Sequence, residues 1–226
     1  MNKPEIVSIT QPLVGGFSAE EYIAHVARVS NPENQFNNET AGKLLVHLLM
    51  KQHWSPFDMV DLTFKIETSK AVAIQILRHN SFRFQEFSQR YSEVKSLDYS
   101  HVEIRKKAIG GNRQGSGERM DKITKVVKGL CDKIAHVYNY CLDFGAAPES
   151  ARMLLPMATP TTLYMKGSVR SWITYFWVRC HKDSQKEHRE LALQMLVLFC
   201  EKFPLLGGVI KSNRPQIVEQ DWINEP

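Results

Sequence analysis

No two of the four cysteines, Cys131, Cys141, Cys180 and Cys200, form a Cys-x-x-Cys pair. This spacing argues against a zinc ribbon or a dithiol redox motif, and four cysteines in 226 residues are too few for a disulfide scaffold. No apolar run approaches membrane-spanning length. The first ten residues have neither the basic start nor the apolar stretch of a signal peptide. We therefore expect a protein of the reducing cytoplasm with no membrane partner.

Several common cofactor and catalytic signatures are also missing. No Gly-x-Gly-x-x-Gly follows a strand-like segment, which argues against a Rossmann dinucleotide site. No Gly-Lys-Ser/Thr follows the glycine-rich residues 109–117, so they form no phosphate-binding P-loop, and we expect a mobile loop there. His181 and His188 do not form His-Glu-x-x-His, and no metal site is predicted.

The bulk composition suits one globular domain. The hydrophobic fraction of 43% in 226 residues is enough for a substantial core, and no repeat or linker divides the chain. We predict a single domain over residues 1–226. The net charge of +5 favours an anionic partner, such as a nucleotide, a glutamate-tailed pteridine or nucleic acid. A basic soluble protein without such a partner explains the net charge alone equally well.

Hydrophobic periodicity predicts helices with a few strands between them. Residues 59–68 alternate well, with Val60, Leu62, Phe64 and Ile66 on one face, which is typical of a half-buried strand. A shorter strand is predicted at residues 6–9. Helices are predicted from a capping box at residues 18–21, around 44–49, and at 70–79, 121–144, 169–180 and 187–203. We predict an α+β fold in which helices pack around a small, mostly antiparallel sheet.

Residues 78–91 combine three arginines, a histidine and a carboxylate with three phenylalanines. An ordinary surface segment does not need these aromatics, and an ordinary core segment does not tolerate these charges. The mixture suits a site for a flat, anionic ligand, because arginines pair with phosphate and aromatics cover a ring. If the segment is extended, the side chains of Glu86, Ser88 and Arg90 point to the same side.

The same segment resembles the signature of the flavin-dependent thymidylate synthases, which is Arg-His-Arg, seven residues, then Ser-x-Arg. Here Arg78-His79 is followed by Asn80, and then, after seven residues, by Ser88-Gln89-Arg90. The third signature position departs from the family, since it holds Asn80 in place of arginine.

Three further segments resemble that family in the family's order. Residues 53–58 resemble its segment of His, any residue, Ser or Thr, Pro, Phe and an acidic residue, with Asp58 one methylene shorter than the usual Glu. Residues 151–156 resemble its Ala-Arg-x-x-Leu-Pro element. Residues 168–179 resemble its Asn-x-Arg-Ser helix, with Ser168 and Thr174 in place of two asparagines.

Each segment taken alone also has a purely structural interpretation. Gln75, Arg78 and His79 share one side of a helix end that water could simply solvate. The bulky aromatics of residues 172–177 suit a core or interface helix equally well. Four segments in family order over residues 53–179 favour the resemblance over chance.

The resemblance implies reductive methylation of dUMP to dTMP in thymidylate biosynthesis. Methylenetetrahydrofolate would supply the carbon and NADPH the reducing equivalents, with FAD as the bound flavoprotein cofactor. Arg179 matches the family arginine that stabilises negative charge on the uracil ring as N3 loses its proton. Cys180 lies roughly 100° from Arg179 on a helix, and we expect no catalytic role for it. The resemblance also implies a homotetramer with active sites at subunit interfaces.

The resemblance assigns the site residues in three groups. The dUMP site would use Gln75, Arg78, Glu86, Ser88, Gln89, Arg90, Arg152 and Arg179. The FAD site would use His53, Ser55, Arg78, His79, Asn80, Glu86, Ser168, Arg170 and Thr174. His53 and Tyr91 are candidates for folate contact. Because Asn80 removes a positive charge beside the flavin, we predict weaker FAD binding than in a typical member.

Two alternatives remain at this point. The departures at Asn80, Ser168 and Thr174 suit a relative with altered chemistry, such as a pyrimidine-nucleotide hydroxymethylase. From another class, a single-stranded nucleic-acid-binding protein would use residues 82–84, Phe-Arg-Phe, to stack on bases. That function leaves the four ordered segments unexplained, so we expect no nucleic-acid partner. The expected location is the cytoplasm, or the host cytosol if the protein is virally encoded.

Overall fold

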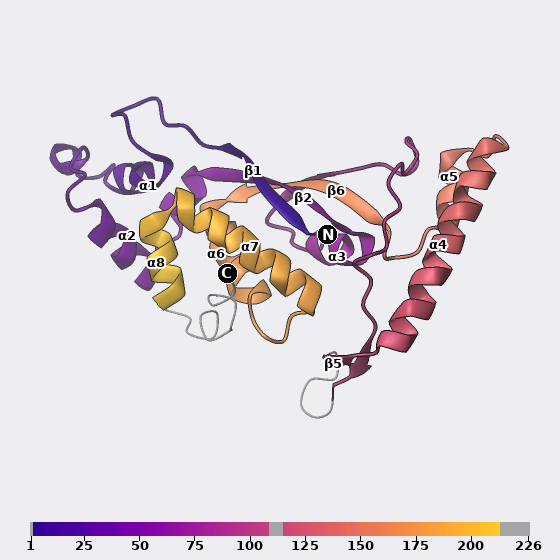
Figure 1. Cartoon of the computed structure of the whole chain (residues 1–226). Helices are drawn as coiled ribbons and strands as arrows, with labels where there is room; N and C mark the ends of the chain where they lie inside the picture. Colours follow the sequence, from indigo (N-terminus) through magenta and orange to yellow (C-terminus); the bar gives the residue numbers. More distant parts are fainter. Residues whose placement is uncertain (1, 109–114, 213–226) are drawn as a thin grey trace. The chain divides into compact units, whose positions relative to one another are not determined.

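The computed structural model describes residues 2–108 and 115–212, and Figure 1 labels most of their elements. Three short 3-10 helices are η1 (Pro32–Asn34), η2 (Ser55–Met59) and η3 (Arg152–Leu154). The α-helices are α1 (Ala19–Ala27), α2 (Ala41–Met50), α3 (Lys70–Ile76), α4 (Asp121–Asp143), α5 (Pro148–Ala151), α6 (Val169–Arg179), α7 (Lys186–Lys202) and α8 (Pro204–Ser212). The strands are β1 (Lys3–Ile9), β2 (Asp61–Ser69), β3 (Arg83–Glu86), β4 (Arg105–Lys107), β5 (Ser116–Arg119) and β6 (Pro160–Ser168).

The strands form two small sheets. One has four strands in the order β1-β2-β6-β3, and the other is the antiparallel pair β4-β5. Helices and these sheets together confirm the predicted α+β class. In the described part of the chain, no helix has both the length and the apolar character needed to cross a bilayer.

The chain divides into two compact units. The first unit comprises Met1–Lys3, Ile66–His79 and Phe84–Tyr164, and the second comprises Pro4–Lys65, Asn80–Arg83 and Met165–Pro226. The strands β2 and β6 each contribute residues to both units.

The predicted alternation of β2 is confirmed. Leu62, Phe64 and Ile66 are fully buried, and the residues between them are partly exposed. Ser69 then begins α3, because its Oγ accepts a hydrogen bond from the Val72 amide at 3.4 Å. The predicted helix over residues 70–79 is too long, since α3 ends at Ile76 and the chain turns, with the His79 amide donating to the Ile76 carbonyl at 3.1 Å.

Trp172 on α6 is the centre of an aromatic core in the second unit. Its fully buried ring lies 4.6 Å from the Phe82 ring and 4.9 Å from the Phe64 ring, measured between centroids. Its Nε1 donates to the Leu62 carbonyl at 3.1 Å, so α6 is fixed to β2. Phe176 extends the core to Phe199 on α7, at 5.3 Å.

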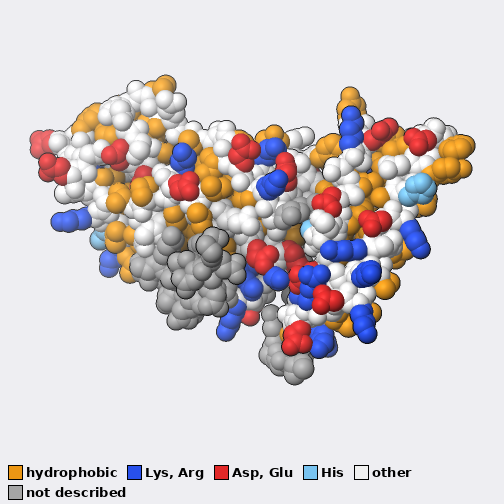
Figure 2. Space-filling model, viewed as in Figure 1, with side chains coloured by type: hydrophobic (Ala, Val, Ile, Leu, Met, Phe, Trp, Pro, Cys, Tyr) orange, Lys and Arg blue, Asp and Glu red, His pale blue; other side chains and the backbone are white. Residues whose placement is uncertain are grey.

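The helix α4 in the first unit ends as predicted, because Gly145 adopts a left-handed conformation with φ of 85°. Tyr138 is the large buried side chain of α4, whereas Ile123, Leu130 and Val137 are exposed. Figure 2 shows hydrophobic side chains at the surface in the region of α4. Only some of the apolar side chains of α4 are therefore buried within the first unit.

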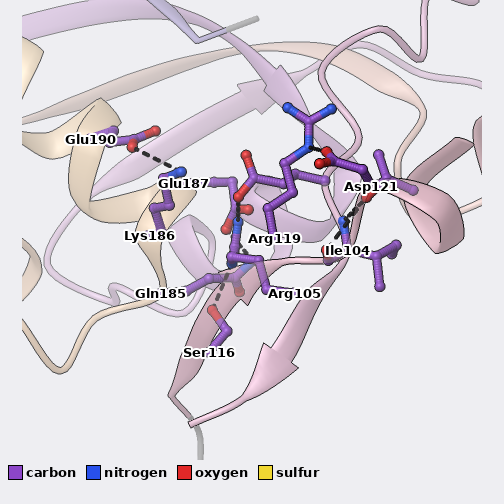
Figure 3. Close-up of polar contacts among 11 residues, drawn as sticks. Ile104, Arg105, Ser116, Arg119, Asp121, Gln185, Lys186, Glu187 and Glu190 are labelled. Carbon is purple, nitrogen blue, oxygen red and sulfur yellow. Dashed lines mark hydrogen bonds and ion pairs between the residues drawn. The ribbon is translucent and has the colours of Figure 1, made fainter.

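The β4-β5 pair occupies part of the predicted loop over residues 109–117. Arg105 lies opposite Arg119, and its Nε donates to Ser116 Oγ at 2.7 Å (Figure 3). Arg119 in turn pairs with Asp121 at 2.8 Å. Residues 109–114 lie outside the described residues. The loop prediction is wrong for Ser116 and Gly117, because pairing with β4 makes them the start of β5.

Candidate functional site

The segment after β3 does not continue as a strand. The strand ends at Glu86, and the chain turns at Ser88, whose carbonyl accepts hydrogen bonds from the Tyr91 and Ser92 amides at 3.2 and 3.0 Å. Ser88 Oγ also accepts from the Tyr91 amide at 3.4 Å, which is a turn-forming contact typical of serine. The segment is therefore not extended, so the condition under which Glu86, Ser88 and Arg90 would point to the same side is not met.

Glu86 lies at the end of β3 as a fixed, mostly buried carboxylate. Lys70 Nζ donates to its Oε1 at 2.8 Å, and Thr161 Oγ1 donates to the same oxygen at 2.9 Å. The first donor comes from the start of α3 and the second from β6. Two donors to one carboxylate oxygen hold the group in a single orientation.

Glu149 brings two of the predicted anion-binding arginines together. Arg90 Nε pairs with its carboxylate at 2.9 Å, and Arg152 Nε donates to its backbone carbonyl at 3.3 Å. The Arg90 pair is exposed, so it contributes little to stability.

Gln89, between Ser88 and Arg90 in sequence, is only 9% exposed, and its Nε2 has no hydrogen-bond partner among the described residues. A buried amide group without a hydrogen-bond partner is unusual and is a feature of functional sites.

A cavity of about 630 Å³ lies beside the start of α6 in the second unit. Ser168 is the N-cap of α6, since its Oγ accepts from the Ser171 amide at 3.3 Å, and it donates to Asp58 Oδ1 at 2.8 Å. Arg170 Nη1 pairs with Asp58 Oδ2 at 3.0 Å. The lining residues are Asp58, Asp61, Ser81, Arg83, Lys166, Gly167, Ser168, Arg170, Ser171 and Thr174.

The other predicted flavin residues lie in several places. His53 is exposed, with its ring 6.2 Å from that of His47, and Ser55 begins η2 in the same unit. Arg78 and His79 belong to the turn after α3 in the first unit, together with Gln75 on α3 itself. None of these residues is among those lining the 630 Å³ cavity of the second unit.

Tyr91 lies at a second cavity, of about 560 Å³, in the first unit. Its side chain is 88% exposed. The lining is more apolar than that of the first cavity and includes Phe87, Val94, Pro148 and Pro160. This cavity suits a planar, partly apolar ligand.

The comparisons with known proteins agree with one another. The family model described as thymidylate synthase complementing protein matches residues 13–205. A flavin-dependent thymidylate synthase of Synechocystis sp. is 45% identical over 216 residues, which cover 93% of this chain and 96% of that protein. The chain belongs to the flavin-dependent thymidylate synthase family.

Further relatives support the membership in the family. A probable flavin-dependent thymidylate synthase of Paramecium bursaria Chlorella virus 1 is 41% identical over 212 residues, covering 91% of this chain and 97% of the relative. A solved structure of the UMP/dUMP methylase PolB from Streptomyces cacaoi, bound with 5-Br dUMP, has a TM-score of 0.77 and 23% identity. It covers 94% of this chain and 95% of PolB, and it shows that the fold is shared.

Arg179, the candidate catalytic arginine of this family member, is half-buried at the end of α6. Burial raises the pKa of the Tyr175 hydroxyl, one turn before Arg179 on α6, and the positive charge of Arg179 opposes that shift. Tyr175 also forms a buried hydrogen bond with His188 Nε2 on α7 at 3.0 Å. The C-terminal end of α6 is therefore attached to α7 by a buried hydrogen bond close to Arg179 in sequence.

The site residues assigned from the sequence do not include several residues that line the first cavity: Asp61, Ser81, Arg83, Lys166 and Ser171. Two of them are separated widely in sequence yet pair directly, since Lys166 Nζ lies 2.9 Å from Asp61 Oδ2. Because Asp61 and Lys166 are far apart in the sequence, no local sequence pattern predicts their ion pair. Phe82 is only 3% exposed in the aromatic core, so it is not available for stacking on nucleic-acid bases.

Proposed function

We propose that this protein catalyses the reductive methylation of dUMP to dTMP, with methylenetetrahydrofolate as carbon donor, NADPH as reductant and FAD as cofactor. Residues 1–226 would act as one catalytic domain in the cytoplasm. The main observation behind the proposal is that two of the segments that resemble the family, residues 53–58 and 168–179, are hydrogen-bonded to each other in the wall of one cavity. Asp58 of residues 53–58 accepts hydrogen bonds from Ser168 and Arg170, which begin α6.

The donors of this cavity fit part of a flavin nucleotide. Flavin supplies hydride-transfer chemistry when it is bound. Ser168, Arg170 and Thr174 would hold it through a hydroxyl-rich wall with fixed cations, which suits phosphate and sugar groups. His53, Ser55, Arg78, His79, Asn80 and Glu86 would complete the cofactor site.

The dUMP phosphate would bind where Arg90 and Arg152 meet at Glu149. Because the ion pair of Arg90 is exposed, the guanidinium can exchange its carboxylate partner for a phosphate at little cost. Ser88 and the unpartnered amide of Gln89 would donate to the same nucleotide. Gln75, Arg78 and Glu86 complete the proposed set of dUMP contacts.

The chemistry at the uracil ring would depend on Arg179. C5 of uracil is a poor nucleophile until negative charge builds up in the ring as N3 loses its proton. A guanidinium stays protonated at all relevant pH values, so Arg179 would stabilise this charge without accepting the proton. Folate would contact Tyr91 at the second cavity and His53.

A homotetramer with shared active sites is supported by the exposed apolar stripe of α4. Ile123, Val126, Leu130 and Val137 recur at spacings of three, four and seven residues and are all exposed. Such a seam on a 23-residue helix suits packing against another subunit.

Turnover with mass analysis tests the function. When the purified protein is supplied with FAD under anaerobic conditions, NADPH should bleach the visible absorbance of the flavin. Adding dUMP and methylenetetrahydrofolate should then restore this absorbance. The product should have the mass of dTMP. A hydroxymethyl product, or flavin that neither binds nor turns over, would contradict the proposal.

A second prediction concerns Cys180, which lies next to Arg179. Burial raises the pKa of the Cys180 thiol to about 12, with a further contribution from Cys200. The thiolate is the nucleophilic form, so at pH 7–8 almost none is present. We expect Cys180→Ser to keep the dTMP formation rate within about threefold of the parent. A loss of a hundredfold or more in a variant that is still folded would show a covalent role for the thiol.

A further inference from the structure

The lining of the 630 Å³ cavity has more positive than negative side chains. Asp58 pairs with Arg170 at 3.0 Å, and Asp61 pairs with Lys166 at 2.9 Å. The fifth charged residue of the lining is Arg83. The two carboxylates are therefore matched by two cations, and the net positive charge of the wall rests on Arg83.

Arg83 contacts only backbone carbonyls in the described part of the chain. Its Nη1 donates to the Phe82 carbonyl at 3.1 Å and to the Asn80 carbonyl at 3.5 Å. Its side chain is exposed at the cavity wall. Neutral acceptors leave the full charge of the guanidinium able to attract an anion.

The backbone that carries Arg83 is held firmly. Phe82 is anchored in the core, with its ring 4.6 Å from that of Trp172. Gly167 permits this approach, since a Cβ there would come within 2.5 Å of the Phe82 ring. Ser171 Oγ donates to the Ser81 carbonyl at 3.4 Å and connects the same segment to α6. A cation on a fixed segment loses little conformational freedom of its backbone when it binds a ligand.

We propose that Arg83 binds the phosphate portion of the cofactor and takes the place of the arginine missing at Asn80. The family signature has its second arginine at the position of Asn80, and here the Arg83 guanidinium lies against the Asn80 carbonyl, in the wall that also holds Ser168 and Arg170. The ligand class is a phosphorylated flavin. This inference rests on the proposed function. The charge of Arg83 would offset the weaker FAD binding that is expected from Asn80 alone.

A charge-exchange experiment tests the inference. FAD affinity would be measured by titration of flavin fluorescence for the parent, Arg83→Gln, Asn80→Arg and the double variant. We expect Arg83→Gln to weaken FAD binding by about tenfold to a hundredfold and to flatten its salt dependence. Asn80→Arg should restore affinity in the Arg83→Gln background and change it by less than about threefold in the parent.

The control is Arg119→Gln, which removes an exposed, carboxylate-paired arginine outside the cavity and should leave FAD affinity unchanged. If Arg83→Gln is poorly folded, Arg83→Lys serves instead and should bind FAD more weakly than the parent while keeping the salt dependence. Unchanged affinity in both Arg83 variants, or no rescue by Asn80→Arg, would overturn the inference. If the parent itself neither binds FAD nor forms dTMP, the proposed function fails instead.

Discussion

Replacing Arg179 with alanine is expected to lower the turnover rate of dTMP formation by about a hundredfold to a thousandfold. The guanidinium would stabilise negative charge that appears on the uracil ring only as the reaction proceeds, so the loss should fall mainly on kcat. Arg179 lies half-buried at the end of α6, one turn after Tyr175, whose hydroxyl forms a buried hydrogen bond with His188. Because the Arg179 side chain is partly buried, its charge acts more strongly than it would in bulk water.

Steady-state kinetics with dUMP as the varied substrate measure this effect. Arg179→Lys keeps the charge but loses the planar fork of donors, and it should recover only part of the rate. The matched control is Val178→Ala, because Val178 is the preceding residue on α6 and its side chain is half-exposed. A rate for Arg179→Ala within tenfold of the Val178→Ala rate would remove Arg179 from the chemistry.

Short-range patterns predict much of this fold. Ser18 and Glu21 form the expected capping box, in which each side chain accepts a hydrogen bond from the backbone amide of the other residue. The burial of β2 follows its alternation, and α6 and α7 begin and end within a residue of their predicted bounds. These features depend on neighbours within a few positions, so the sequence contains the whole of their physical cause.

The features that the sequence did not predict depend on distant residues. Ser168 and Asp58 are 110 positions apart, yet their contact shapes the candidate cofactor cavity. The chain turns at Ser88 because the Tyr91 and Ser92 amides donate hydrogen bonds to Ser88 oxygens. The alternation of side chains along the sequence does not predict these backbone hydrogen bonds. The nucleic-acid alternative uses Phe-Arg-Phe at residues 82–84 as one unit, and the packing of Phe82 on Trp172 is what separates Phe82 from the exposed Arg83.

Trp172→Ala is expected to reduce the free energy of unfolding by about 4 kcal/mol, the largest loss of stability that we predict. The Trp172 ring is fully buried between the Phe64 and Phe82 rings, and removal would leave a large cavity and an unpaired Leu62 carbonyl. In a chain of 226 residues this corresponds to a decrease in Tm of roughly 10 °C. Urea denaturation and thermal melts measure the change.

The same substitution should weaken FAD binding, because Trp172 connects the two walls of the cofactor cavity. Its Nε1 holds α6 to β2, and Phe82 beneath it fixes the segment that carries Arg83. Trp172→Phe keeps most of the buried ring but loses the hydrogen bond to Leu62, so it should cost about 1–2 kcal/mol. If Trp172→Ala is destabilised as expected yet binds FAD as tightly as Trp172→Phe at a temperature where both are folded, the cavity does not depend on this core.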